Sequence, residues 1–409
     1  MPHVTPEIET FARIKVIGLG GSGNNALAHM INSKVHGVEF VAINTDAQDL
    51  HRSPAKKRIN IGKNLTRGLG TGMNPELGRR AIEDSKEDVQ EVLKGADMVF
   101  LSGGVGGGTF SGASPIAARI AKELGALTIA VVTKPFYFEG QQRAKIAETA
   151  LNELKKEVDA IIIIPNDRLL SIVDKNTTMK NAFAICDEIL RQAVEGISDL
   201  ITTPGIINID FADVRAVLEN AGSALMGVGS ASGDNRAVEA ARQAINSPLL
   251  DVSIAGAKGV LFSIAGGEDL TMFEIQDAAK VITESIDKDA KVIFGTIRDD
   301  KLKKNEIRIT VIAAGFPETS KSNTPARPAA QRTLEEVFPV KEEKRNRIFN
   351  SLSRESTRDT SPIAPLPKET AAETPVKEKV EEKKTSSVAK DDDDDWGAIP
   401  AFLRRSKLK

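Results

Sequence analysis

Residues 102–113 read Ser-Gly-Gly-Val-Gly-Gly-Gly-Thr-Phe-Ser-Gly-Ala, and this glycine cluster directly follows the apolar run 98–101. Glycine removes the Cβ atom where a backbone turns sharply, so that successive N–H groups can surround an anion. Residues 115–124 then have helical spacing, so the loop opens onto a helix N-terminus, where phosphate binds readily. The stretch lacks the Gly-Lys-Ser/Thr ending of a Walker A loop. The sequence therefore predicts a phosphate site that is not a P-loop.

A second glycine loop lies upstream, between a strand predicted at 14–17 and a helix that extends to residue 31. Its glycines fit the G-x-G-x-x-G dinucleotide pattern at residues 18–23, which alone is a weak signal. The next predicted strand ends in Asn44-Thr45-Asp46, at the carboxyl end where α/β sheets bind ligands. Each loop could simply be a tight turn between a strand and a helix. Two such loops together with the Asn-Thr-Asp segment favour a nucleotide site.

Composition bounds the class of protein. With 409 residues the chain exceeds the size of a single core, so two packed domains and a tail are expected. A net charge of −2 argues against a dedicated nucleic-acid surface, and no apolar run is long enough to span a bilayer. The acidic start does not fit a signal peptide. A lone Cys186, expected to be buried in a helix, is consistent with a reducing cytoplasm, and the four histidines lack metal-ligand spacing, so no metal site is predicted.

Hydrophobic patterning divides the chain. Short apolar strands alternate with helical periods over residues 11–175, which predicts an α/β, Rossmann-like domain with a parallel sheet. Apolar residues at helical spacing predict one long connecting helix at 176–203, followed by a second, α+β domain at 204–316. Residues 317–394 are rich in Pro, Ser, Thr, Glu and Lys, which predicts a disordered linker. Residues 1–10 are expected to be a flexible N-terminus. The predicted strands lie at 14–17, 39–43, 98–101, 128–132, 160–164, 206–209, 259–265, 291–297 and 307–313.

These motifs resemble those of the FtsZ family, the bacterial tubulin-like cell-division GTPases. Residues 106–112 are similar to the tubulin/FtsZ signature loop, and residues 44–48 are similar to the family's Asn-Thr-Asp-Ala-Gln segment. The resemblance covers residues 11 to about 316 nearly continuously, then the last dozen, and it implies the tubulin/FtsZ fold. Further matches follow in order at Gly70–Glu76, Thr133–Phe136, Phe138–Gly140, Arg143, Pro165–Asp167, Asn208–Asp213 and Ile399–Leu403.

The resemblance implies a site for GTP or GDP, with Mg²⁺ carried by the nucleotide. It implies that the first glycine loop lines the phosphates and ribose, and that the second holds the β and γ phosphates. Glu139 and Arg143 match contacts to sugar and phosphate, although spacing alone would make them a surface i,i+4 pair. The implied contact residues of these regions are Gly21, Ser22, Gly23, Asn24, Asn25, Asn44, Asp46, Gly72, Gly107, Gly108, Thr109, Phe110, Glu139 and Arg143.

The family positions that contact guanine match Asn166, Phe183 and Asp187. Phe183 could stack on the base, although without the resemblance it would be ordinary helix core. The carboxylate of Asp187 could accept hydrogen bonds from guanine N1–H and N2–H. It would reject adenine, whose N1 is an acceptor.

Asp210 and Asp213 lie just before and within a predicted helix start, so spacing alone makes them acids that favour the helix dipole. The resemblance implies instead a catalytic loop that contacts the GTP of the next subunit in a head-to-tail filament. Asn208 would orient this loop, and the two carboxylates would polarise water and help hold a cation near the γ-phosphate. The implied protein is an assembly-dependent GTPase that scaffolds the division ring at midcell, in the cytoplasm.

The end of the chain is a separate predicted module at 395–409. The acidic run Asp391–Asp395 precedes Trp396–Arg405, whose apolar side chains suit folding onto a groove. This stretch resembles the FtsZ C-terminal peptide, which docks onto regulators and onto membrane tethers such as the actin-like FtsA. The implied partners are further copies of the chain and FtsA-like proteins. Neither nucleic acid nor direct membrane insertion is expected.

Phe110 departs from the family pattern, which has glycine between Thr109 and the residue matching Ser111. A phenylalanine held at positive φ would be strained by about 1–3 kcal/mol. The ring could instead point into the core with ordinary backbone, or crowd the γ-phosphate, or occupy a position where fast turnover is not required. We expect retained GTP binding with slower hydrolysis. Ser22, where the family usually has glycine, is a milder departure.

Two alternatives stay open. A nucleotide-binding filament scaffold with weak or no hydrolysis would follow if Phe110 impairs the phosphate loop. A dinucleotide-dependent oxidoreductase would explain the first glycine loop, but it leaves the second loop and the tail unexplained.

Overall fold

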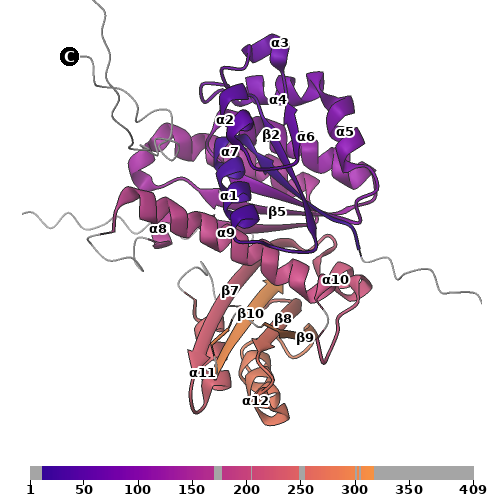
Figure 1. The fold of residues 1–409 in the computed structure, drawn as a ribbon, viewed down its shortest axis with the longest axis vertical. Helices are drawn as coiled ribbons and strands as arrows, with labels where there is room; N and C mark the ends of the chain where they lie inside the picture. Colours follow the sequence, from indigo (N-terminus) through magenta and orange to yellow (C-terminus); the bar gives the residue numbers. More distant parts are fainter. Residues whose placement is uncertain are drawn as a thin grey trace, which may run out of the picture. The chain divides into compact units, whose positions relative to one another are not determined.

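The computed structural model describes residues 12–169, 177–203, 205–247, 254–299, 302–303 and 305–316 (Figure 1). The predictions made for 1–10, 317–394 and 395–409 lie outside the described residues. The helices are α1 Gly20–Asn32, α2 Ala47–Arg52, α3 Lys63–Thr66, α4 Pro75–Asp84, α5 Lys86–Leu93, α6 Gly108–Glu123, α7 Gln141–Glu157, α8 Asn166–Leu169, α9 Met179–Thr202, α10 Phe211–Leu218, α11 Arg236–Ile245 and α12 Met272–Thr283.

The described strands form one ten-stranded sheet in the order β3-β2-β1-β4-β5-β6-β7-β10-β8-β9. The first six pair in parallel, and their order 3-2-1-4-5-6 is that of a doubly wound nucleotide-binding sheet. This confirms the predicted α/β class. The strands are β1 Ile14–Leu19, β2 Val38–Asn44, β3 Lys57–Asn60, β4 Met98–Gly104, β5 Leu127–Lys134, β6 Ala160–Pro165, β7 Gly222–Ser232, β8 Gly259–Gly266, β9 Lys291–Arg298 and β10 Glu306–Ala314.

Helices cover both faces of the parallel strands, because successive residues of each strand point to opposite faces. On one face, residues such as Val16 and Phe100 pack in a core shared with α1 and α9. On the other, Ile17 and Leu101 pack in a core shared with α4, α5, α6 and α7. Both faces of these strands are therefore apolar, which explains why they read as continuous hydrophobic runs.

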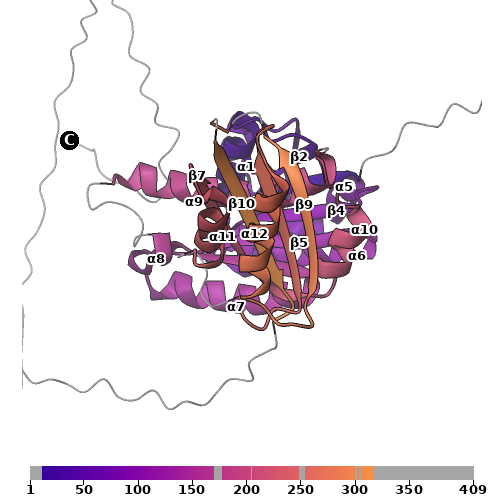
Figure 2. The ribbon, with the colours of Figure 1, turned by 90° about the horizontal axis from the view of Figure 1, so that it is seen from below.

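The second half of the chain continues the same sheet. β7 pairs in parallel with β6 over residues 222–224, and β10 then pairs antiparallel with both β7 and β8. Two helices, α11 and α12, pack on one face around a separate core, and Figure 2 shows them side by side in front of these strands. The predicted domain boundaries at 175/176 and 203/204 remain predictions.

The long helix predicted at 176–203 is α9, which begins at Met179 after the N-cap Thr178. It carries Cys186, which is buried as expected, and burial raises the pKa of this thiol to about 12. Its last residue, Thr202, contacts the loop before β2, where a Cβ on Gly37 would lie 2.5 Å from Thr202 Oγ1. One end of α9 therefore lies at the amino end of the parallel strands.

Three segments differ from the sequence prediction. Residues 206–209 are not a strand, because the Asn208 side chain accepts a hydrogen bond from Gly205 N at 2.7 Å and holds the backbone in a local turn. The strand β3 was not predicted, since it is short and begins with two exposed basic residues. The glycine- and serine-rich β7 was also missed. Its glycines are needed because a Cβ on Gly227 would lie 1.9 Å from Ala244 O of α11.

Candidate functional site

The two glycine loops meet at the carboxyl ends of neighbouring strands, β1 and β4. Each strand passes almost directly into a helix, α1 or α6. The close fit of α1 requires glycine, because a Cβ on Gly23 would lie 2.4 Å from Ser102 O and one on Gly18 would lie 2.6 Å from Gly23 O. Gly21 and Asn25 are exposed beside this contact. The first glycine loop therefore places its backbone amides next to the second one.

The N-terminus of α6 presents free backbone amides. The first hydrogen bond of the helix is donated by Ser111 N to Gly107 O at 3.3 Å, so the amides of residues 108–110 precede it. Before the helix, Gly106 adopts φ +100° and donates its N–H to Ser111 Oγ at 2.9 Å. A Cβ on Gly107 would meet no atom within 4 Å, so open space adjoins these amides. Amides around such a space fit an anionic group such as phosphate.

Ser22 joins the two loops. Its Oγ accepts a hydrogen bond from Gly104 N at 2.8 Å, which fixes the end of β4 against the first turn of α1. The departure from the family's glycine is thus accommodated by a specific contact that sequence reasoning did not predict.

A cluster of threonine hydroxyls holds the surrounding segments together. Thr109 Oγ1 lies 2.8 Å from Thr45 Oγ1 and 3.2 Å from Thr71 Oγ1, and all three residues are buried. The hydroxyl of Thr109 is therefore engaged inside the protein, and α6 is tied to the segments that carry Asn44 and Gly72. Gly72 adopts φ +57°, and a Cβ there would meet no atom within 4 Å. Thr45 and Thr71 lie inside matched motifs, but neither was predicted to have a role in the site.

A half-buried carboxylate organises the polar residues at the end of β2. Asp49 Oδ2 accepts hydrogen bonds from Asn44 Nδ2 at 2.7 Å and from Asn24 Nδ2 at 3.3 Å. Burial raises the pKa of Asp49, against the effect of these two amide donors. Asp46 caps α2 by accepting from Gln48 N and from Asp49 N. Asp49 was not predicted, and only its place in the first turn after Asp46 could have suggested it.

Glu139 and Arg143 form the i,i+4 ion pair that spacing alone suggested, with Arg143 Nη1 2.9 Å from Glu139 Oε2. They also adjoin the second glycine loop, because a Cβ on Gly106 would lie 3.0 Å from Arg143 O. Glu139 Oε1 accepts from Phe136 N at 3.0 Å, which fixes the turn before α7. The pair is therefore partly buried, unlike the surface pair that spacing alone suggested, and it is a neighbour of the phosphate loop.

The three predicted guanine contacts lie on α8 and α9, which pack together. Asn166 is buried, and within the described residues its Oδ1 has no hydrogen-bond partner. The half-buried ring of Phe183 packs edge-on against Phe136, with ring centres 5.5 Å apart. Burial raises the pKa of Asp187 to about 7, while the nearby charge of His29 lowers it. An unpartnered buried acceptor and a carboxylate in a poorly solvated position are what a bound base would satisfy.

The predicted catalytic residues lie elsewhere. Asp210 caps α10, with its Oδ1 3.4 Å from Ala212 N, and Asp213 lies in the first turn of the same helix. Both are exposed, as is Asn208. They follow the end of α9 that lies at the amino end of the parallel strands, and Figure 1 shows α9 running between the α8 side and the α10 side. Within one chain they are therefore on the opposite edge of the sheet from the glycine loops.

Phe110 lies in the first turn of α6, and it is not among the residues with positive φ, so the strain that a positive φ would cause is absent. Its side chain is 2% exposed and belongs to the apolar core under α6. The ring lies against Gly103 of β4, where a Cβ would be 2.2 Å from Phe110 Cδ2. The ring thus points into the core and only the backbone of this residue is available to a ligand. The ring can take this position because Gly103 has no side chain and leaves the space that the ring fills.

Two adjacent glycines offer a matched test of the phosphate site. Gly107→Ala adds a methyl group to open space at φ −85°, so the free energy of unfolding without ligand should stay within about 0.5 kcal/mol, while affinity for nucleotide falls. Gly108→Ala would place its Cβ 2.4 Å from Thr71 Oγ1 and should destabilise the fold by about 1–3 kcal/mol. Urea unfolding and nucleotide titration separate the two effects. Unchanged affinity in Gly107→Ala would show that phosphate does not use this space.

This chain is similar to a family of known proteins. The model of the Tubulin/FtsZ family GTPase domain matches residues 13–174, and the model of the FtsZ family C-terminal domain matches residues 222–317. A solved empty FtsZ dimer from M. jannaschii is 45% identical with a TM-score of 0.72, over 75% of this chain and 89% of that chain. CetZ2 from Haloferax volcanii, solved as a GTPγS-bound protofilament, is 22% identical with a TM-score of 0.65 over 75% and 94% of the two chains. That second likeness concerns the fold alone.

Identity of this extent over most of both chains adds to the paired glycine loops and the 3-2-1-4-5-6 sheet. The chain belongs to the FtsZ family of tubulin-like, GTP-binding cytoskeletal GTPases.

Proposed function

We propose that this protein binds and hydrolyses GTP and polymerises head-to-tail, with each hydrolysis site completed by Asp210 and Asp213 of the next subunit. One observation carries the proposal: the candidate catalytic acids lie on the opposite edge of the sheet from the phosphate loops of their own chain. A head-to-tail contact brings opposite edges of two chains together. Membership in the FtsZ family removes the dinucleotide-dependent oxidoreductase as an alternative.

The chemistry suits a divided site. Phosphoryl transfer depends on positioning and on compensation of charge more than on covalent catalysis. The free amides of α6 would hold the β and γ phosphates, and Mg²⁺ carried by the nucleotide would supply further positive charge. The exposed carboxylates of Asp210 and Asp213 would polarise the attacking water. Asn208 would keep their loop in shape through its bond to Gly205 N.

Exposed apolar side chains next to both halves of the site support self-association. Leu69, which bridges to Asp46, is 81% exposed, and Ile206, two residues before Asn208, is also 81% exposed. Single apolar side chains in water are common on protein surfaces, so these two support self-association only through their places beside the two halves of the divided site. The solved M. jannaschii relative is described as a dimer, and the Haloferax CetZ2 as a protofilament.

The proposal extends to the cell. We infer that the filament scaffolds the division ring at midcell in the cytoplasm and is tethered by an FtsA-like protein through Trp396–Arg405. The docking peptide lies outside the described residues, so its sequence alone supports this part. Within the described residues, no helix is both long and apolar enough to cross a bilayer.

The core position of Phe110 counts against the alternative of a nucleotide-binding filament scaffold with weak or no hydrolysis. That alternative depended on a ring that strains the loop or crowds the γ-phosphate. The ring is instead packed against Gly103, so no described contact favours the alternative.

Concentration dependence tests the divided site. We expect GTP hydrolysis per subunit to fall steeply below a threshold concentration of protein, and sedimentable polymer to appear at the same threshold. Phosphate release and sedimentation are measured in parallel across a dilution series. Hydrolysis per subunit that stays constant at high dilution contradicts the proposal, because each chain would then hold a complete site.

GTP binding should depend on pH through Asp187. The base donates two N–H groups, so only the ionised carboxylate can accept both. Because burial raises the pKa of Asp187 to about 7, the group is mostly protonated below that value and mostly ionised above it. The dissociation constant should therefore be about tenfold higher at pH 6 than at pH 8, with little change above pH 8. Asp187→Asn separates this effect from titration of the nucleotide's own phosphate, which remains in the variant. Equal pH dependence in both chains would remove Asp187 from the base site.

A further inference from the structure

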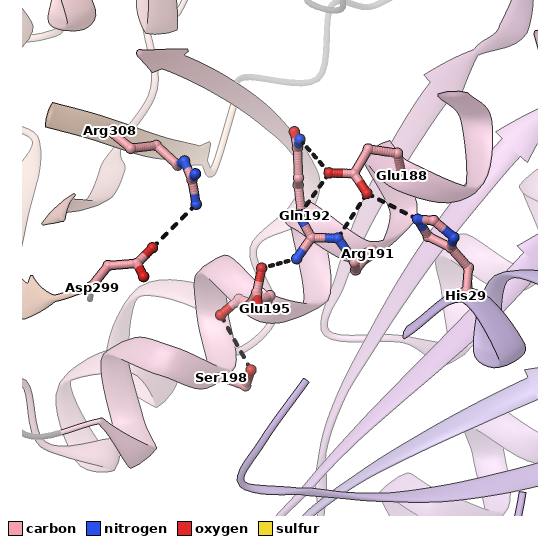
Figure 3. A network of polar contacts seen from close by, with 8 residues as sticks. All are labelled: His29, Glu188, Arg191, Gln192, Glu195, Ser198, Asp299 and Arg308. Atoms are coloured by element: carbon pink, nitrogen blue, oxygen red, sulfur yellow. Dashed lines mark hydrogen bonds and ion pairs between the residues drawn. The ribbon is translucent and has the colours of Figure 1, made fainter. Parts of the chain in front are cut away.

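A hydrogen bond between side chains joins the helix of the first glycine loop to the helix that carries Asp187 (Figure 3). His29 Nε2, in the last turn of α1, lies 2.9 Å from Glu188 Oε2 on α9. Glu188 directly follows Asp187 and lies five positions after Phe183. The bond therefore connects the phosphate side of the candidate site to its base side.

Further hydrogen bonds from α9 hold the carboxylate of Glu188 in place. Arg191 donates to both of its oxygens at 2.8 and 2.6 Å, and Gln192 Nε2 donates at 2.9 Å. Arg191 is itself fixed by Glu195, one turn further along α9, as Figure 3 shows. Burial raises the pKa of Glu188, but the hydrogen bonds from Arg191, His29 and Gln192 outweigh it and bring the pKa to about 2. A carboxylate that stays ionised only accepts, so His29 must carry a proton on Nε2.

The contact also lies at a useful place along α9. The far end of the helix is fixed by the close approach of Thr202 to Gly37. In its first half α9 packs on α1, and the bond from His29 to Glu188, the tenth of its 24 residues, fixes the residues next to Asp187. Two anchors that are far apart on one helix set both its position and its rotation.

We propose that His29 is a positioning residue for the nucleotide: through Glu188 it holds Phe183 and Asp187 at a fixed distance from the first glycine loop, and so sets the affinity for a guanine nucleotide. The inference rests on the proposed GTP site. A ligand that contacts both α1 and α9 binds more tightly when the two helices are already in place, because ordering them on binding costs affinity. His29 itself faces Glu188, and the structure gives it no role at the phosphates.

Three variants of the full chain test this inference. His29→Leu keeps the bulk and removes the donor, while His29→Gln keeps an N–H group at similar reach. His36→Leu is the matched control, since His36 is an exposed histidine in the loop after α1. Titrations with GTP and with inosine triphosphate, which lacks the guanine amino group, give the affinities. Turnover at saturating GTP is measured alongside.

We expect His29→Leu to weaken GTP binding about tenfold, the loss of one hydrogen bond to a charged acceptor. His29→Gln should restore affinity to within about threefold, and His36→Leu should leave it unchanged. The preference for GTP over inosine triphosphate should fall in His29→Leu, whereas turnover at saturation stays within about twofold. General destabilisation of the fold would lower both affinity and turnover, so a loss of affinity alone would distinguish the two causes.

Several results would overturn the inference. Affinity in His29→Leu equal to that of the unmodified chain would do so, as would equal losses in the Leu and Gln variants, which would indicate packing alone. If His29→Leu does not fold, Glu188→Ala removes the acceptor instead and must show the same loss. Failure of the unmodified chain to bind GTP is a different outcome, because it refutes the proposed function itself.

Discussion

Replacing Asp213 by alanine is expected to lower GTP turnover by on the order of 100-fold or more while GTP binding stays within about twofold. The reason is that Asp213 is exposed on the edge of the sheet opposite to its own phosphate loops. Among the described residues its carboxylate has no hydrogen-bond or ion-pair partner, so little of the fold depends on it. Losing one acid from the first turn of α10 should cost less than about 1 kcal/mol of stability. Phosphate release at saturating GTP and direct titration measure the two quantities.

The exposed acid Asp277 on α12 provides the control, because Asp277→Ala makes the same chemical change away from the candidate site. A mixing experiment tests the division between subunits more directly. Asp187→Ala damages only the base site, and Asp213→Ala only the catalytic edge. A mixed filament contains some junctions in which both halves are intact, so the mixture should hydrolyse GTP faster than either variant alone. If Asp213→Ala fails to bind GTP, or if mixing restores nothing, the acids do not act on a neighbouring chain.

The parallel half of the fold could be predicted because its signals are local. The strands β1 and β4 are apolar on both faces and each is followed by a glycine loop and a helix, so strand, turn and helix are all visible within about twenty residues of sequence. The strand β7 gave no such signal. Its glycines Gly227 and Gly229 leave no room for a Cβ because α11 approaches the strand closely, and that contact joins segments that the sequence pattern does not relate.

The same difference separates the predicted from the unpredicted parts of the site. Motifs located the loops, but the contacts that fix them join distant positions. Ser22 to Gly104 spans 82 residues, Thr45 to Thr109 spans 64 and His29 to Glu188 spans 159. None of these pairs has a periodic or compositional signature. Asp49 is an example. It accepts hydrogen bonds from the side-chain amides of Asn24 and Asn44, which the sequence shows only as members of two separate motifs.

Phe110 shows how one contact can decide between outcomes that the sequence leaves open. The family pattern has glycine at this position, so the sequence left three outcomes open: a ring in the core with ordinary backbone, a ring that crowds the γ-phosphate, or a position where fast turnover is not required. The first outcome holds: the backbone of Phe110 does not have positive φ, and its ring occupies the space beside Gly103, which has no side chain. The rate of hydrolysis should then depend on Asp210, Asp213 and the contact between subunits rather than on the side chain of Phe110.

Restoring the family's glycine should therefore lower the stability of the fold without raising the turnover of GTP. Phe110→Gly removes a fully buried ring and should cost about 3–5 kcal/mol for the cavity, with about 1 kcal/mol more for glycine in a helix. That is a large share of the 5–15 kcal/mol by which domains are usually stable. Urea unfolding measures the loss, and turnover at saturating GTP should not rise. Phe110→Leu, which keeps most of the volume, is the matched control.

A double substitution identifies the cause of that loss. Gly103→Ala alone should destabilise the fold, because its Cβ would lie 2.2 Å from the ring of Phe110. In the Phe110→Gly background the same methyl group no longer meets the ring and keeps only a 3.0 Å approach to Leu19 O, so it should cost much less and the two changes will not be additive. Independent costs would show that the ring does not occupy the space beside Gly103. A stable Phe110→Gly chain with faster turnover would instead place Phe110 at the phosphates, which its burial and its helical backbone argue against.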